Sequence, residues 1–169
     1  SYTDLDFSVE GETYTTQHTF TWLAGETYDL YIEDMYQTKG IDGERFRFSQ
    51  WSDSETSQLY RLTAPFNDTT ITAEFVKQYY LNTSTEYGNV SGEGWYDEGA
   101  VAGFSISTLN YAVTDTTRKR FSGWTGDISG TETEKNVTMY QPLSVSALWK
   151  NQYYLNISTD YGQVNGAGW

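Results

Sequence analysis

Short stretches of alternating apolar and polar residues run along most of this chain. A period of two is typical of β-strands that have one face on a core and the other in water. No stretch has the 3.6-residue apolar period of an amphipathic helix. Residues 33–43 and 107–117 alternate least, and we expect loops or at most a short helix there. The stretches that predict strands are residues 5–9, 28–32, 71–75, 79–83, 102–106, 145–149 and 153–157. The pattern predicts an all-β fold with antiparallel sheets.

The predicted strands recur because the chain repeats itself. Residues 78–95 read QYYLNTSTEYGNVSGEGW and residues 152–169 read QYYLNISTDYGQVNGAGW, a spacing of 74 (152 minus 78), and 13 of these 18 positions are identical. A second pair, RFSQWSD at residues 47–53 and RFSGWTGD at residues 120–127, matches at a spacing of 73. A repeat of this length indicates tandem structural modules.

We therefore divide the chain into three segments. Residues 1–77 are predicted to form a diverged first module and residues 78–151 a second module. Residues 152–169 are predicted to be the opening strand and hairpin of a third, incomplete module. In this scheme, residues 5–9 are the first module's counterpart of residues 79–83.

Aromatic residues make up 17% of the chain and supply the apolar bulk that such small modules need. The aromatics that we expect in the cores are Phe48, Trp51, Phe75, Phe121, Trp124 and Trp149. Glycines also recur: Gly88, Gly92 and Gly94 reappear 74 residues later. They predict a hairpin connection with positive φ angles.

The order of these motifs resembles a known family. The chain has YYL, YG and GEGWY within residues 79–96, then RFSGWTGD, and then TMYQPLSVSALWKNQYYL at residues 138–155. This arrangement is similar to the divergent internalin-type B-repeats, which recur in tandem along bacterial and archaeal surface proteins. The resemblance implies an extracellular location and a small β-grasp-like fold. An immunoglobulin-like sandwich is the alternative. The resemblance to the B-repeat family implies no catalytic residues.

Composition excludes several classes of function. The chain has 23 acidic and 10 basic side chains, and the net charge of -13 repels nucleic acid. It has no cysteine, which excludes disulfides, thiolate zinc sites and cysteine nucleophiles. It has no apolar run of 18 residues, so we expect no direct membrane insertion. His18 is the only imidazole and a poor candidate for a general base, and neighbouring acids such as Asp97 and Glu98 arise by chance in so acidic a chain. We expect no enzyme and no cofactor.

Two kinds of modification or binding site remain. Five Asn-X-Ser/Thr sequences fit N-glycosylation of a secreted protein, at Asn67, Asn82, Asn89, Asn136 and Asn156. Asp53 and Asp127 follow the two tryptophan motifs, and their oxygens could hold Ca²⁺. No EF-hand loop is present, so solvated acids are the simpler interpretation.

The predicted function is structural: a stalk, surface-layer or filament segment whose partners are neighbouring repeats or copies of itself. The alternative is an adhesin that stacks surface glycans on exposed rings, with Tyr80, Tyr96 and Tyr154 as candidates. The incomplete third module also suggests self-association, because an unpartnered strand can add to the sheet edge of another chain.

Overall fold

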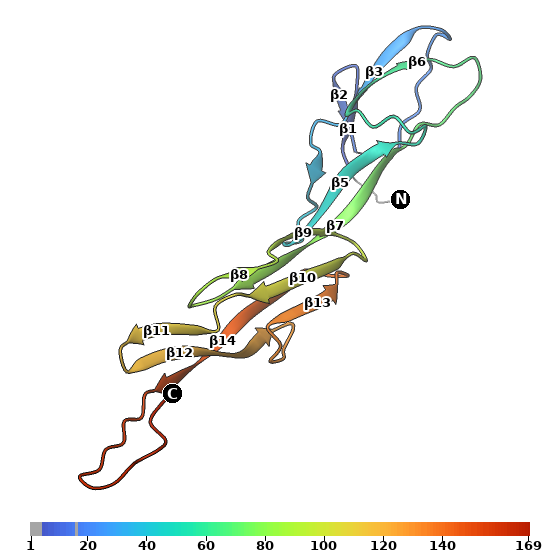
Figure 1. Ribbon diagram of the computed structural model, residues 1–169. Coiled ribbons are helices and arrows are strands. Elements are labelled where there is room, and N and C mark those ends of the chain that lie inside the picture. Colours follow the sequence, from blue (N-terminus) through green and yellow to red (C-terminus); the bar gives the residue numbers. More distant parts are fainter. Residues whose placement is uncertain (1–4, 16) are drawn as a thin grey trace. The chain divides into compact units, whose positions relative to one another are not determined.

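The computed structural model describes residues 5–15 and 17–169 (Figure 1). These residues form fourteen strands and no helix, so the predicted all-β fold is confirmed. The chain divides into two compact units, unit 1 (Ser1–Tyr79) and unit 2 (Tyr80–Trp169). The division falls inside strand β7 (Ala73–Ser84), so this strand supplies its first half to unit 1 and its second half to unit 2.

Unit 1 contains two groups of paired strands. One is an antiparallel sheet in the order β2-β1-β3-β6, and in the other β5 pairs with β4 and with the first half of β7. The bounds are β1 (Phe7–Val9), β2 (Glu12–Tyr14), β3 (Thr27–Tyr31), β4 (Tyr36–Gln37), β5 (Glu44–Trp51) and β6 (Leu59–Thr63). Its core is a cluster of buried side chains, formed by Val9, Leu30, Ile32, Phe48 and Trp51.

Unit 2 also has two groups of strands. One sheet has the order β13-β10-β8, and the other has the order β11-β12-β14-β7, with β9 also pairing with β7. The bounds are β8 (Val90–Ser91), β9 (Gly94–Asp97), β10 (Val101–Ile106), β11 (Asn110–Thr114), β12 (Thr117–Gly126), β13 (Glu134–Thr138) and β14 (Leu143–Tyr153).

The pair β5–β7 of unit 1 and the pair β12–β14 of unit 2 repeat each other closely. Both have a β-bulge after the Phe of the RFS motif, where the register shifts beyond Phe48 and beyond Phe121. Phe48 and Trp51 have ring centroids 5.6 Å apart, and the rings of Phe121 and Trp124 are 5.3 Å apart. All four side chains are buried. The repeated RFS motif is thus a repeated structural element.

Each tryptophan of this motif also satisfies its polar atom. The indole Nε1 of Trp51 donates to the Ser57 carbonyl at 3.0 Å, and that of Trp124 donates to the Glu132 carbonyl at 2.8 Å. A buried N–H without such an acceptor would lose its hydration at a cost of about 1–3 kcal/mol. The other two aromatics expected in the cores, Phe75 and Trp149, are half-buried.

Residues 33–43 and 107–117 differ from the expectation of loops or a short helix. They contain the short strands β4 and β11. All five residues of β11 are exposed, and it is the outermost strand of its sheet. An edge strand held by backbone hydrogen bonds and exposed on both faces has no reason to alternate apolar with polar residues, so the pattern does not reveal it.

The glycine connection is built as predicted. Gly88 and Gly92 have φ angles of 69° and 102°. A Cβ at Gly88 would overlap the side chain of Thr108, and one at Gly92 would overlap the backbone of Gly103 and Phe104. Gly162, the later counterpart of Gly88, also has a positive φ of 87°, but a Cβ there would meet nothing within 4 Å.

Strand β1 does not lie where the repeat alignment predicts. Residues 5–9 were expected to be equivalent to residues 79–83, yet residues 81–84 pair in parallel with β14, whereas β1 pairs antiparallel with β3. In unit 2, β10 is the counterpart of β3. It pairs with β13 and with β8, and β8 is the strand that pairs with β10 as β1 pairs with β3. The predicted equivalence is therefore wrong.

The register gives the correct match. Ser8 lies opposite Tyr31, and Ser91 lies opposite Ser105, which is Tyr31 plus 74. Ser8 thus corresponds to Ser91 at an offset of 83, and SVEG at residues 8–11 matches SGEG at residues 91–94. This four-residue match is short and has an offset of 83, so an alignment at the spacing of 74 that the long repeat indicates does not find it.

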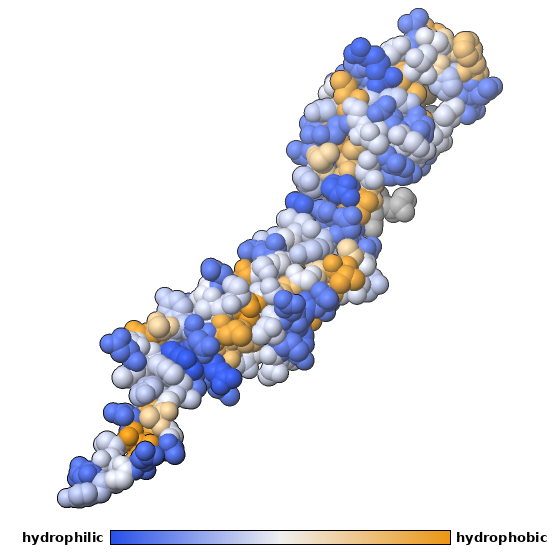
Figure 2. All heavy atoms as spheres, viewed as in Figure 1, coloured by the Kyte–Doolittle hydropathy of each residue, from blue (hydrophilic) through white to orange (hydrophobic). Residues whose placement is uncertain are grey.

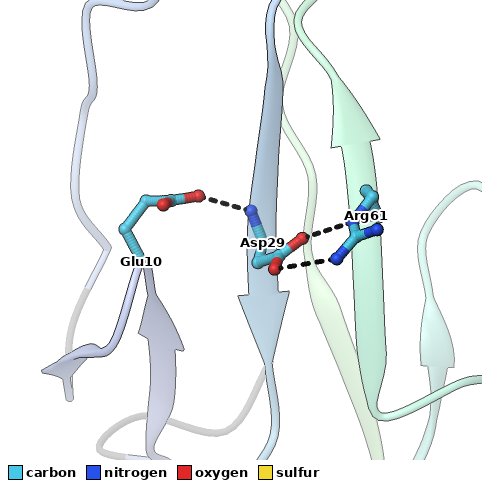
Figure 3. A network of polar contacts seen from close by, with 3 residues as sticks. All are labelled: Glu10, Asp29 and Arg61. Carbon is cyan, nitrogen blue, oxygen red and sulfur yellow. Dashed lines mark hydrogen bonds and ion pairs between the residues drawn. The ribbon is translucent and has the colours of Figure 1, made fainter.

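Charged side chains tie the turn after β1 to β3 (Figure 3). Glu10 has a φ of 50°, and its carboxylate accepts a hydrogen bond of 2.6 Å from the backbone N–H of Asp29. The Asp29 carboxylate accepts two hydrogen bonds from Arg61 of β6, at 2.9 and 3.3 Å. The hydrogen bond from Arg61 holds the pKa of Asp29 below its usual value. These contacts are exposed, so salt screens them.

Candidate functional site

Two strand segments of unit 2 lie side by side and run in the same direction. We call residues Leu81–Ser84 of β7 the opening strand and residues Leu143–Ser146 of β14 the closing strand. Leu81 lies opposite Leu143, and the register continues to Ser84 opposite Ser146. The closing strand continues along β14 to Tyr153. The first and the last strand of the repeat are therefore direct, parallel neighbours.

Side chains join these two strands on both faces. On the buried face, Leu81 and Val145 are 0% exposed and Thr83 is 7% exposed. On the exposed face, the Asn82 amide donates to the Ser144 hydroxyl at 3.1 Å, and the hydroxyls of Ser84 and Ser146 are 2.5 Å apart. The Thr83 hydroxyl is buried and has no hydrogen-bond partner among the described residues.

Sequence reasoning missed this pairing, although a signal was present. The opening strand reads LNTS and the closing strand reads LSVS, and both place polar residues at the second and fourth positions. The matching alternation is compatible with two neighbouring strands whose polar side chains lie on the same, solvent-exposed face of the sheet. Alternation alone does not select a partner, however, because many segments of the chain share it.

The predicted glycosylation sites are all exposed: Asn67, Asn82, Asn89, Asn136 and Asn156. Asn82 differs from Asn156 because its amide already donates to Ser144. A glycan would be attached to the same Asn82 nitrogen that donates to Ser144, whereas Asn156 lies in the segment after β14. Glycosylation stays a prediction at all five positions.

The tyrosines predicted to stack on glycans pack on other parts of the chain. Tyr80 lies 5.1 Å from Trp95 between ring centroids, and its hydroxyl donates to Glu93 at 2.6 Å. That hydrogen bond raises the pKa of Tyr80 above its ordinary value. The Tyr96 hydroxyl donates to the Gly92 carbonyl at 2.9 Å. These contacts help to hold the hairpin that follows the opening strand.

The same ring pair recurs in the last segment. Tyr154 and Trp169 are Tyr80 and Trp95 plus 74, and their centroids are 5.7 Å apart with an interplanar angle of 74°. The Arg118 guanidinium lies 4.4 Å from the Trp169 ring centroid. The two rings are steeply inclined to each other and do not form one flat platform. Glycan stacking at these positions is untested.

The acids after the tryptophan motifs bind nearby donors. The Asp127 carboxylate accepts the backbone N–H of Ser144 at 2.7 Å, and Asp53 accepts the hydroxyl of Tyr60. Burial and the hydrogen bond to Asp53 raise the pKa of Tyr60 to about 12. Within residues 5–15 and 17–169, no group of three or more His, Asp or Glu side chains is placed to hold a metal ion.

Two hollows among the described residues have different linings. One, of about 50 Å³, is lined by the acids Asp6, Glu33 and Asp34 together with Phe7, Thr13 and Gln37. The other, of about 350 Å³, is lined by Arg120, Phe121, Ser122, Thr131 and Lys150. The lining of this larger hollow includes two cationic side chains, Arg120 and Lys150, but neither a carboxylate nor an imidazole. His18 instead packs its ring against Tyr14 and Phe20, at 4.6 Å from each. Within residues 5–15 and 17–169 there is no helix long and apolar enough to cross a membrane.

Comparison with known proteins assigns the second repeat. Residues 79–152 match the family described as the divergent InlB B-repeat domain. This confirms the resemblance, and the matched residues begin beside the opening strand and end near the end of β14. The family is a non-catalytic repeat type found in cell-surface proteins. Comparison with curated proteins and with solved structures found no match.

Proposed function

Because residues 79–152 are a divergent InlB B-repeat domain, we propose that this chain is a load-bearing repeat segment of an extracellular surface protein. Its role is to keep other parts of that protein attached and separated while the chain is under tension. A stalk, a surface layer and a filament all require this property. One observation carries the proposal, the parallel contact between the opening and closing strands.

The direction of these strands decides how a pulling force acts on them. Tension enters unit 2 at Tyr80, just before the opening strand, and leaves along β14 towards Tyr153. Since the strands are parallel neighbours, the force pulls them past each other along their length. Their hydrogen bonds are then loaded together rather than one after another. A pair loaded at one shared end would instead peel apart bond by bond.

The contacts across the pair suit such loading. Sliding the opening strand by one residue would place Leu81 and Thr83 on the wet face, because side chains alternate between the two faces of a strand. It would also break the Asn82–Ser144 and Ser84–Ser146 contacts. The buried and the polar face therefore resist the same displacement.

Single-molecule pulling in two directions tests the proposal. The chain has no native cysteine, so handles can be attached at chosen positions. In the first geometry both ends of the chain are pulled. In the second, the first end is kept and the other handle moves to Gln141→Cys, just before the closing strand. Force then acts on the same end of both strands.

We expect a higher rupture force for unit 2 in the first geometry than in the second at equal pulling speed. Unfolding of unit 2 identifies the event by the chain length that it releases: up to about 250 Å in the first geometry, which loads residues 80–153, and up to about 210 Å in the second, which loads residues 80–141. Rupture under force reports the unfolding rate, so equal thermodynamic stability does not predict equal force. Equal rupture forces in the two geometries would overturn the proposal.

A further inference from the structure

Among the described residues of unit 1, none forms a counterpart of the opening strand of unit 2. In unit 2 the closing strand has β12 on one side and the opening strand on the other. Residues Thr69–Thr72 are the counterpart of the closing strand at a spacing of 74. On one side the Ser52 N–H donates to the Thr72 carbonyl at 2.9 Å. On the other, no strand formed by the described residues pairs with them. We call Thr69–Thr72 the acceptor segment.

The burial of the acceptor segment reflects this difference. Val145 in the closing strand is 0% exposed, whereas its counterpart Ile71 is only half-buried against the core of unit 1. The residues on either side of Ile71, Thr70 and Thr72, are exposed. The side chain of Ile71 thus has part of its surface in water, whereas Val145, which lies opposite Thr83 of the opening strand, is fully buried.

Residues 155–158 are the counterpart of the opening strand, and no closing strand formed by the described residues lies beside them. Residues 155–158 read LNIS, against LNTS in the opening strand of unit 2. Leu155 is 57% exposed and Ile157 is 40% exposed, whereas the equivalent Leu81 and Thr83 are 0% and 7% exposed. Apolar side chains reach the surface in the segment after β14 (Figure 2). We call residues 155–158 the donor segment.

We propose that the donor segment of one chain adds in parallel to the acceptor segment of a second copy. The pair in unit 2 fixes the register: Leu155 lies opposite Thr69 and Ser158 opposite Thr72, as Leu81 lies opposite Leu143 and Ser84 opposite Ser146. Strand addition of this kind satisfies the backbone groups of both edges.

The side chains match in this register. Ile157 comes beside Ile71 on the core face. Asn156 comes beside the Thr70 hydroxyl and Ser158 beside the Thr72 hydroxyl, which reproduces the Asn82–Ser144 and Ser84–Ser146 contacts. Neither four-residue segment carries a charge. The contact therefore adds no local repulsion to the net charge of -13 on each copy.

The contact joins different surfaces of the two chains. Donor and acceptor are different surfaces, so association is head to tail and produces either open chains of copies or closed rings. The acidic copies repel one another, and salt screens this repulsion. Association should therefore grow with protein concentration and with salt. This inference does not depend on the load-bearing role.

The experiment measures the mass of the full chain in solution by light scattering, at low and at high salt. We expect the unchanged chain to form larger species as concentration rises. Ile157→Lys should abolish this, because it places a charge against the core of the partner. Val164→Lys is the control, since Val164 is 41% exposed in the same final segment but lies outside the donor segment.

Engineered cysteines test the register independently. A chain with Thr72→Cys is mixed with a chain carrying Ser158→Cys under mild oxidation, and we expect a disulfide between the two different chains. Thr69→Cys replaces Thr72→Cys in the control, three residues out of register, and should link at least tenfold less, because a disulfide requires Cα atoms about 4.4–6.8 Å apart. A monomer at every concentration, equal effects of the two lysine variants, or equal linking in both mixtures would each refute the proposal.

Discussion

Leu81 and Leu155 offer a direct test of the importance of the parallel strand pair. They are the same residue at equivalent positions of the repeat, but Leu81 is 0% exposed and Leu155 is 57% exposed. Leu81 lies opposite Leu143 on the buried face, whereas Leu155 makes a single bridge to Gly168. Replacing each by alanine therefore removes the same atoms from two environments.

The expected difference is large for a unit of this size. Burying a leucine side chain contributes about 1.5–3 kcal/mol, and the cavity left by Leu→Ala raises the total loss to about 2–5 kcal/mol. At an exposed position the loss is within about 0.5 kcal/mol. The whole free energy of unfolding of such a unit is roughly 5–15 kcal/mol. Leu81→Ala should therefore lower the Tm of unit 2 by about 8 °C or more.

Urea unfolding followed by tryptophan fluorescence measures the loss, and hydrogen exchange with mass spectrometry assigns it to unit 2. Low salt and dilute protein keep the donor segment unassociated during the measurement. We expect faster exchange in β7 and β14 for Leu81→Ala and little change for Leu155→Ala. Similar losses of stability in the two variants would show that the opening strand contributes little to unit 2.

Three further predictions concern single side chains. Thr83→Val removes a buried hydroxyl that has no partner among the described residues, so it should stabilise unit 2 by about 1 kcal/mol in urea unfolding, while Thr83→Ser should not. The pKa of Tyr60 is raised to about 12, so its contribution to stability is complete below pH 10 and is lost as pH rises from 10 to about 12. Tyr60→Phe should therefore flatten the fall of the unfolding free energy in that range, and an unchanged slope would contradict the assigned shift. Gly88→Ala should destabilise unit 2 more than Gly162→Ala in thermal unfolding, because both positions have a positive φ but only Gly88 faces a side chain, that of Thr108. Equal losses would show that Thr108 moves aside without cost.

Local patterns were enough to predict the fold class and the repeated half of each unit. Alternation in residues 102–106 and 145–149 reflects real one-sided burial, in β10 and β14. The aromatics of the two RFS motifs were predicted to lie in the cores, because bulky rings in a small module have few places to pack. The prediction of positive φ at the glycines was correct for a different reason. A positive φ is a property of the backbone at that position, so predicting it requires no knowledge of distant residues.

Contacts between distant residues could not be predicted in the same way. The opening and closing strands are 62 residues apart (143 minus 81), and the sequence of neither strand identifies the other as its pairing partner. The N-terminal residues were misassigned for a related reason, since alternation in residues 5–9 fits either β7 or β8. Only the partner strand, β3, distinguishes the two. Strand β11 was missed because no burial pattern accompanies an exposed edge.

The donor segment shows that the neighbouring strand has a larger effect on the burial of this strand than its own sequence has. LNIS and LNTS differ at one position, and that position is more apolar in the donor segment, yet the donor segment is the exposed one. Burial of this strand therefore comes from the closing strand beside it and not from its own residues. The same leucine can then report on two contacts: Leu81→Ala should weaken folding within one chain, and Leu155→Ala should weaken association between chains. If Leu155→Ala left association unchanged at high salt while Leu81→Ala destabilised unit 2, the contact between copies would not reproduce the one inside unit 2, and the inferred register would be wrong.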